Sequence, residues 1–279
     1  MAAQRPYDTT AYRYPREQLV LALTLLLVLL VIILTATATF CASFLVVVAV
    51  VAFSYARNRS HHRALMEQAR LVTEQSAPAL APIVAESVAR LQAGPVHVFI
   101  APGNSLNAYT FGLVYPKVVV LHSSLLQVMD VDELRFVLGH ELGHVRLGHT
   151  RLNSLVGGMA GIPSPSVASV VLALAFLWWN RACEHSADRA GLLACGKPHK
   201  AISALVKLAA GEGSLTRTGL ERALRHIEAE DDHALAGLGE SLFTHPMMVR
   251  RIEELRRYAS TAEYRRLQAL MAGNVVGGD

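Results

Sequence analysis

The chain has 279 residues, a formal net charge of +4, and 52% hydrophobic residues. That length is enough for one sizeable core with additional elements. Its basic residues form no stripe interleaved with aromatic residues, which argues against a nucleic-acid partner. The three cysteines, Cys41, Cys183 and Cys195, show no paired spacing, so the sequence indicates a reducing compartment rather than a disulfide framework.

The apolar residues are concentrated near the N-terminus, because no charged residue occurs in residues 19–56. One straight helix of that length would run about 57 Å, nearly twice the ~30 Å hydrocarbon core of a bilayer. We therefore predict a transmembrane hairpin of two spans over 19–56, meeting in the weaker stretch 35–40. A cleaved signal peptide is the alternative, but its apolar region would be shorter. Arginines on both sides favour a hairpin with both ends in the cytoplasm.

The rest of the chain predicts a mostly α fold with a small β-sheet. Alternating apolar residues indicate strands at 96–103, 106–112 and 117–122. Asp130 and Glu133 have the spacing of a capping box that opens a helix. Helices are expected over 61–75, 83–94, 131–149, 166–196, 200–210, 215–230, 246–258 and 260–272, the last capped by Ser260 with Glu263. The apolar stretch 166–179 is shorter than the roughly 20 residues of a straight span, which favours burial or partial embedding near the bilayer.

The stretch LGHELGHVRLGHT, residues 138–150, carries a metal-ligand pattern. His140 and His144 are four residues apart on the predicted helix, so they project within ~40° of each other and can coordinate one zinc ion. Glu141 is offset by about 100° and can act as a general base without ligating the metal. This short pattern also arises by chance. His149 lies about 180° from His140 unless the helix breaks at Gly148, so we expect a capping or surface residue there.

A third protein ligand must come from elsewhere, and residues 180–191 offer one. Glu184 and Asp188 are four apart on a second predicted helix and so share a face. Glu184 could be the third zinc ligand, and Asp188 could accept a hydrogen bond from the other ring nitrogen of a ligating histidine. The alternative for this pair is a solvated acidic edge balanced by Arg181 and Arg189.

At these residues the sequence resembles the HtpX-like membrane-bound zinc metalloendopeptidases, which belong to the same superfamily as the CAAX prenyl proteases. The segments that carry the resemblance are NAYTFG, HELGH, EHSAD and HPMMVRRI. The resemblance implies a gluzincin-type catalytic domain, with HELGH and EHSAD supplying the zinc site. It also implies that Asn107, Ala108 and Tyr109 belong to an edge strand that receives substrate, and that His245 and Arg251 position substrate or stabilise the oxyanion. HtpX-like proteins often carry a second membrane hairpin between the two zinc motifs, whereas that interval is short here.

The expected organisation is a cytoplasmic segment (1–18), the hairpin (19–56), a linker with amphipathic helices (57–95), a zinc metallopeptidase domain (96–272) and a loose tail (273–279). We expect one zinc ion per chain and peptide or protein substrates, with damaged or misfolded membrane proteins as candidates. The hairpin would anchor the chain in the plasma membrane, with the catalytic domain on the cytoplasmic side. The oligomeric state stays open. Two alternatives are a prenyl-protein protease and a non-catalytic zinc-binding scaffold or sensor.

Overall fold

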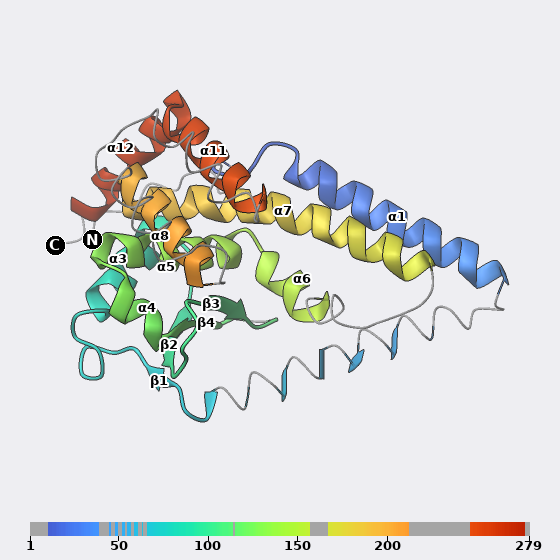
Figure 1. The fold of residues 1–279 in the computed structure, drawn as a ribbon, viewed down its shortest axis with the longest axis horizontal. Coiled ribbons are helices and arrows are strands. Elements are labelled where there is room, and N and C mark those ends of the chain that lie inside the picture. The colour runs from blue at the N-terminus through green and yellow to red at the C-terminus, as the bar shows by residue number, and fades with distance from the viewer. Residues whose placement is uncertain are drawn as a thin grey trace.

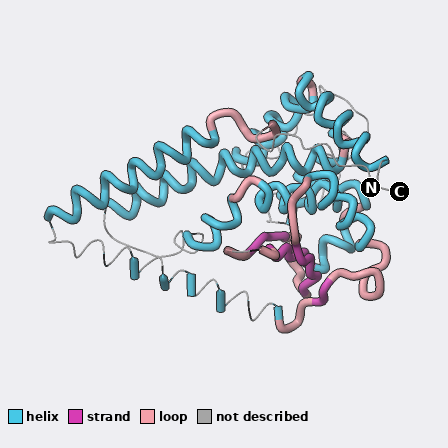
Figure 2. The backbone as a smooth tube through the Cα atoms, turned by 180° about the vertical axis from the view of Figure 1, so that it is seen from behind, coloured by secondary structure: helices cyan, strands magenta, loops and turns pink. Residues whose placement is uncertain are grey.

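The structure is a computed structural model that describes residues 11–38, 66–113, 115–156, 167–211 and 246–276, with isolated positions between 45 and 63. These residues are mostly helical and include one small sheet (Figure 1 and Figure 2). The helices are α1 (Glu17–Ala38), α3 (Ala81–Leu91), α4 (Ser123–Val128), α5 (Val131–Arg146), α6 (His149–Val156), α7 (Val167–Cys195), α8 (Pro198–Gly211), α11 (Pro246–Ala259) and α12 (Ala262–Val276). The strands are β1 (Arg70–Leu71), β2 (Val96–Ala101), β3 (Ala108–Phe111) and β4 (Lys117–His122).

The sheet has the strand order β1-β2-β4-β3. Strands β2 and β4 are parallel, and the outer strands β1 and β3 each run antiparallel to their neighbour. Val98, Val119 and Leu121 point into the main core, which the sheet shares with the helices. Strand β3 therefore lies at one edge of the sheet, beside α5 and α6.

The three predicted strands correspond to β2, β3 and β4, and the helices predicted over 83–94, 166–196, 200–210 and 246–258 correspond to α3, α7, α8 and α11. Three predictions were wrong in detail. The helix expected over 131–149 ends at Arg146, and His149 begins α6. The helix expected over 61–75 gives way to β1, which pairs with Ile100 and Phe99 of β2. Helix α12 is capped by Thr261, whose Oγ1 accepts from the N–H of Tyr264 at 3.1 Å. The helix predicted over 215–230 lies outside the described residues.

Helix α5 begins where its capping box predicts. Asp130 Oδ1 accepts from the N–H groups of Asp132 and Glu133, and Glu133 Oε2 accepts from the N–H of Asp130 at 2.8 Å. The Glu133 carboxylate is buried and is also bound by Ser203 and Lys207 of α8. The first turn of α5 is thus held both locally and by a neighbouring helix, which fixes where the following turns lie.

Helices α5 and α7 cross at very short range. A Cβ atom added to Gly143 would lie 2.6 Å from Ala190 Cβ, and one added to Gly139 would lie 2.4 Å from Ala194 Cβ. Such distances leave no room for a side chain, so small residues on both helices set the separation. This crossing places the third and fourth turns of α5 directly against the C-terminal third of α7.

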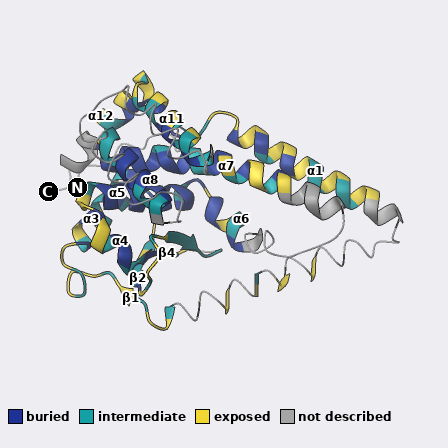
Figure 3. Ribbon diagram, viewed as in Figure 1, coloured by how far each residue is buried: buried dark blue, intermediate teal, exposed yellow. Residues whose placement is uncertain are grey.

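Helix α1 packs along the outer part of α7, away from the sheet (Figure 1). Buried residues dominate where α7 meets α5 and α8, whereas α1 and the neighbouring part of α7 expose many side chains (Figure 3). The large exposed residues there include Leu26, Leu34, Leu174 and Trp178. The described residues of 166–179 differ in burial. Trp179 is buried in the protein, as one of the two expected outcomes requires, whereas Leu174 and Trp178 form an exposed apolar surface beside α1. Partial embedding near the bilayer stays a prediction.

Among the described residues, one helix is long and apolar enough to cross a membrane, over residues 17–34 with a mean hydropathy of 2.8. It starts two residues before the predicted hairpin and continues to Ala38, into the stretch predicted to hold the turn. Most of the predicted second span falls outside the described residues. The two-span hairpin therefore stays a prediction.

The close α5–α7 crossing predicts that adding one methyl group at Gly143 destabilises the fold. Gly143→Ala should lower the free energy of unfolding of the metal-free chain by about 1–3 kcal/mol, because overpacking outweighs the better helix propensity of alanine. Chemical denaturation measures this loss.

Ala190→Gly provides the matched second variant, because it removes the methyl group that Gly143→Ala meets. The double variant should lose less stability than the two single losses added together, by about 0.5 kcal/mol or more. Strictly additive losses would contradict the close crossing.

Candidate metal centre

Three side chains from α5 and α7 converge on one point. His140 Nε2 and His144 Nε2 are 3.2 Å apart. The two carboxylate oxygens of Glu184 lie 3.5 Å from these nitrogens, one oxygen facing each ring. His140 and His144 are buried, and the Glu184 side chain is one-third exposed. The α5–α7 crossing therefore joins the two predicted motifs into a single cluster.

The spacing of this cluster fits a tetrahedral cation. Ligand atoms about 2.0–2.1 Å from zinc lie roughly 3.3 Å from one another in tetrahedral geometry. The observed separations of 3.2 and 3.5 Å are close to this value. Two histidines and one carboxylate are also a ligand set that leaves a fourth position open, as catalytic zinc sites do. His140, His144 and Glu184 could therefore hold one zinc ion.

The outer nitrogen of His140 is bound by Asp188. His140 Nδ1 lies 3.0 Å from Asp188 Oδ1, and the Asp188 side chain is 2% exposed. An ionised carboxylate only accepts hydrogen bonds, so Nδ1 carries a proton, and Nε2 is the nitrogen left to bind a metal. Burial alone lowers the pKa of His140, but Asp188 and Glu184 outweigh it and raise this pKa to about 10. The cluster thus attracts positive charge.

Arg251 of α11 neutralises both acidic residues. Its Nε and one terminal nitrogen donate to Asp188 at 2.8 and 2.6 Å, and its other terminal nitrogen lies 3.1 Å from Glu184 Oε2. Burial opposes ionisation of Glu184, yet Arg251 and the two imidazoles hold its pKa well below the usual range. Burial likewise opposes ionisation of Asp188, and Arg251 again lowers the pKa. Arg251 also lines the cleft, so a contact with substrate stays a prediction.

The outer nitrogen of His144 is bound by His149, and here the prediction was wrong. His149 is 2% exposed, and its Nδ1 lies 3.1 Å from His144 Nδ1. Helix α5 ends at Arg146, and Gly148 has a φ of +84°, a conformation that favours glycine. This break turns the chain, so His149 opens α6 and points back toward α5 instead of lying on its far side.

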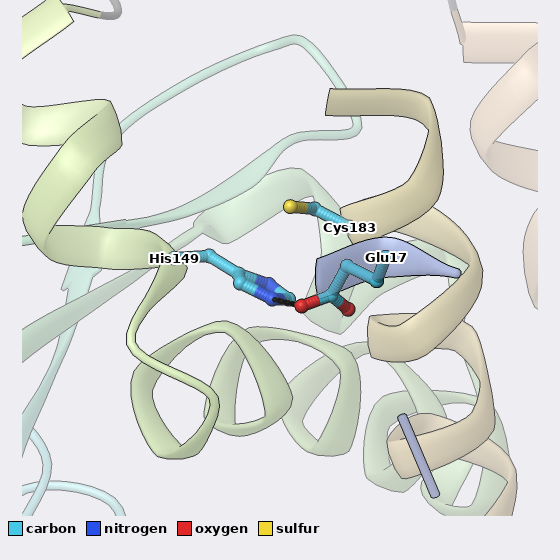
Figure 4. A group of neighbouring side chains, drawn as sticks. All are labelled: Glu17, His149 and Cys183. Carbon is cyan, nitrogen blue, oxygen red and sulfur yellow. Dashed lines mark hydrogen bonds and ion pairs between the residues drawn. The ribbon is translucent and has the colours of Figure 1, made fainter. Parts of the chain in front are cut away.

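The residue that sequence reasoning missed is Glu17, in the first turn of α1. Its side chain is 1% exposed, and its Oε1 lies 3.1 Å from His149 Nε2. It also contacts Arg13 and Ser186 (Figure 4 shows its contact with His149). The only signal in the sequence is an acidic residue directly before a long uncharged segment, which also fits an ordinary helix start.

Glu141 lies beside the cluster and lines a cleft of about 790 Å³. This residue is 6% exposed, and burial raises the pKa of its carboxyl group above the usual value. The same cleft is lined by His140, His144 and Glu184. The base predicted from the motif and the three possible ligands therefore face one shared space.

Strand β3 forms a wall of this cleft, which is also lined by Asn107, Ala108 and Tyr109. The C=O of Asn107 accepts from the N–H of His122, so Asn107 faces β4. Backbone groups alternate along an antiparallel strand, so those of Ala108 and Thr110 point away from β4. The edge of β3 thus offers backbone donors and acceptors. His245 lies outside the described residues, and its predicted role stays a prediction.

Comparison with known proteins agrees with this geometry. The model of peptidase family M48 matches residues 74–259, more than half of the chain. The chain belongs to peptidase family M48. This M48 chain is 29% identical to a protease HtpX homolog of Paenarthrobacter aurescens (strain TC1), over 77% of this chain and 84% of that protein. It is 31% identical to a protease HtpX homolog of Pyrococcus abyssi (strain GE5 / Orsay), over 68% of this chain and 77% of that protein.

A third relative is the plastoglobule-localized metallopeptidase 48 of Arabidopsis thaliana, 31% identical over 58% of this chain and 51% of the plant protein. The M48 chain thus spans about half the length of that relative. No solved structure matches the chain. Membership of M48 confirms the resemblance to HtpX-like proteases and makes the chain a metallopeptidase.

The ion pairs of Arg251 predict a stability effect in the M48 domain. Arg251→Met should lower the free energy of unfolding of the metal-free chain by about 3–5 kcal/mol, because two acidic side chains lose their cationic partner. The loss should shrink with excess zinc, since the metal supplies positive charge to the same groups. Denaturant titrations with and without zinc measure both values.

The neighbouring Arg250 is exposed and serves as the control. Arg250→Met should change stability by less than about 0.5 kcal/mol. Equal losses for the two variants would show that Arg251 acts only as a surface cation.

Proposed function

We propose that the chain is a membrane-anchored, zinc-dependent endopeptidase. The observation that carries this proposal is the convergence of His140, His144 and Glu184, with Glu141 facing the same cleft. Zinc, when bound, acidifies a coordinated water and polarises the carbonyl of the bond to be cut. The chain's membership of M48 supports hydrolysis of peptide bonds as the reaction.

Each residue has its own part in this proposal. Glu141 takes a proton from the attacking water and returns it to the leaving amine. His140, His144 and Glu184 hold the zinc ion. Asp188 orients His140 through its Nδ1 at 3.0 Å, as partners of metal-ligating histidines do.

The substrate would enter the cleft as an extended strand. The edge of β3 presents the backbone of Ala108 and Thr110, which can pair with a peptide through main-chain hydrogen bonds. Such pairing depends little on side chains, which suits broad sequence tolerance.

The membrane supplies the substrates in this proposal. The apolar helix at 17–34 would anchor the chain in the plasma membrane, with the two-span hairpin holding the catalytic domain on the cytoplasmic side. The exposed apolar residues Leu174 and Trp178 beside α1 would enter the same layer. A cleft held close to the bilayer meets damaged or misfolded membrane proteins, which are the substrates we propose.

The role of Glu141 predicts a specific loss. Glu141→Gln should lower kcat by about 10²–10⁴-fold while leaving zinc content unchanged, because the amide cannot take a proton. Cleavage of casein by the purified chain in detergent measures kcat, and metal analysis measures zinc.

Three outcomes would contradict the proposal. Equal cleavage by Glu141→Gln and the wild type would remove Glu141 from the mechanism. Cleavage confined to prenylated peptides would favour a prenyl-protein protease. A wild type that binds zinc but cuts neither substrate would favour a scaffold or sensor.

The edge strand predicts a second effect. Ala108→Pro removes one outward N–H without cutting the ladder to β4, and should lower kcat/KM on peptides by about ten- to a hundredfold, mainly through KM. Peptide cleavage kinetics measure the two constants.

Ala108→Ser keeps the N–H and serves as the control, with kinetics close to wild type. Both variants should retain zinc and unfold at a similar temperature. An unchanged KM for Ala108→Pro would exclude substrate pairing at this position.

A further inference from the structure

A second cluster of metal-binding residue types lies behind the proposed zinc site. Glu17, His149 and Cys183 are all buried, and one ligand atom of each lies within 4.8 Å of the others (Figure 4). These residue types can bind zinc. Their hydrogen bonds, however, indicate another use.

The polar atoms of Glu17 and His149 already have partners. The Glu17 carboxylate accepts from Arg13, Ser186 and His149. His149 uses both ring nitrogens, one toward Glu17 at 3.1 Å and one toward His144 at 3.1 Å. A metal ion would have to displace these contacts.

Glu17, His149 and His144 form a series of hydrogen bonds, and elementary chemistry fixes which atom donates in each. The Glu17 carboxylate only accepts hydrogen bonds, so His149 Nε2 carries the proton that it donates. In a neutral imidazole the other nitrogen then has a lone pair, so His149 Nδ1 accepts. His144 Nδ1 must therefore be the donor, which leaves a lone pair on His144 Nε2, the atom that faces His140 and Glu184.

We propose that Glu17 and His149 are positioning residues that orient His144 and fix the tautomer able to bind metal. Asp188 orients His140 by a direct hydrogen bond. The Glu17 carboxylate acts on His144 indirectly, through the imidazole of His149. This inference rests on the proposed role of His144 as a zinc ligand. The carboxylate comes from the first turn of α1, so the candidate membrane-crossing helix completes the metal centre.

Further contacts hold the start of α1 in place. The N–H of Tyr14 donates to Ser186 Oγ at 2.8 Å, and Arg189 donates to the C=O of Arg13 at 3.2 Å. Tyr12 is fully buried in the main core. The segment before the apolar helix is therefore part of the peptidase domain's packing, and Glu17 has a fixed position relative to α7.

The test measures zinc affinity of the full chain in detergent by competition with a chelator. Glu17→Leu and His149→Leu should each weaken zinc binding by about 10–100-fold. The double variant should bind zinc no more weakly than the weaker of the two single variants, because either substitution alone already interrupts the hydrogen bonds from Glu17 through His149 to His144. His149→Leu provides an independent variant should Glu17→Leu not fold.

Two further variants separate positioning from mere packing. Glu17→Gln keeps an oxygen that accepts from His149, so it should restore most of the affinity that Glu17→Leu loses. Thr24→Val removes a different buried contact between α1 and α7, in which Thr24 donates to the C=O of Ala175 at 3.2 Å. It should leave zinc affinity unchanged.

The outcomes that overturn the inference are distinct from those that overturn the proposed function. Wild-type affinity in Glu17→Leu and His149→Leu, or an equal loss in Thr24→Val, would overturn the inference alone. So would a second zinc ion per chain that Cys183→Ser removes, because Glu17 and His149 would then be ligands themselves. Zinc binding that Glu184→Gln leaves unchanged would overturn the proposed function together with the inference.

Discussion

The close crossing of α5 and α7 is the constraint on which the metal centre depends. Each helix carries half of the site, and neither half can bind a catalytic metal alone. Gly143 and Gly139 let the helices approach until Ala190 and Ala194 nearly touch the α5 backbone. At a larger separation Glu184 would not reach the two imidazoles. The small residues at the contact between α5 and α7 are therefore as necessary to the site as its ligands.

The second constraint is charge. Glu184 and Asp188 lie close together, and Arg251 is the cationic side chain that contacts both. The Nε2 atoms of the two buried imidazoles, His140 and His144, face the same point and lie 3.2 Å apart. A cation at that point would satisfy both nitrogens and the carboxylate together. The Nδ1 atoms of both rings are hydrogen-bonded, that of His140 to Asp188 and that of His144 to His149. These bonds orient the rings before a metal binds and lower the entropic cost of ordering them.

The sequence predicted what depends on local spacing. His140 and His144 share a face because they are four apart, and Asp130 caps α5 because its partner is three residues away. Their meeting with Glu184 depended on combining two motifs, which the family resemblance supported. His149 was misjudged because the break at Gly148 changes its direction. Glu17 was missed because its partners His149 and Ser186 lie more than a hundred residues away, and β1 was missed because two residues carry no strand pattern of their own.

An anomalous difference map at the zinc absorption edge, from crystals of the full chain, tests the central claim most directly. The account predicts one peak per chain, about 2.0–2.2 Å from His140 Nε2, His144 Nε2 and a carboxylate oxygen of Glu184. Crystals of zinc-loaded protein with no peak between these three residues, or with a peak only among Glu17, His149 and Cys183, would contradict it.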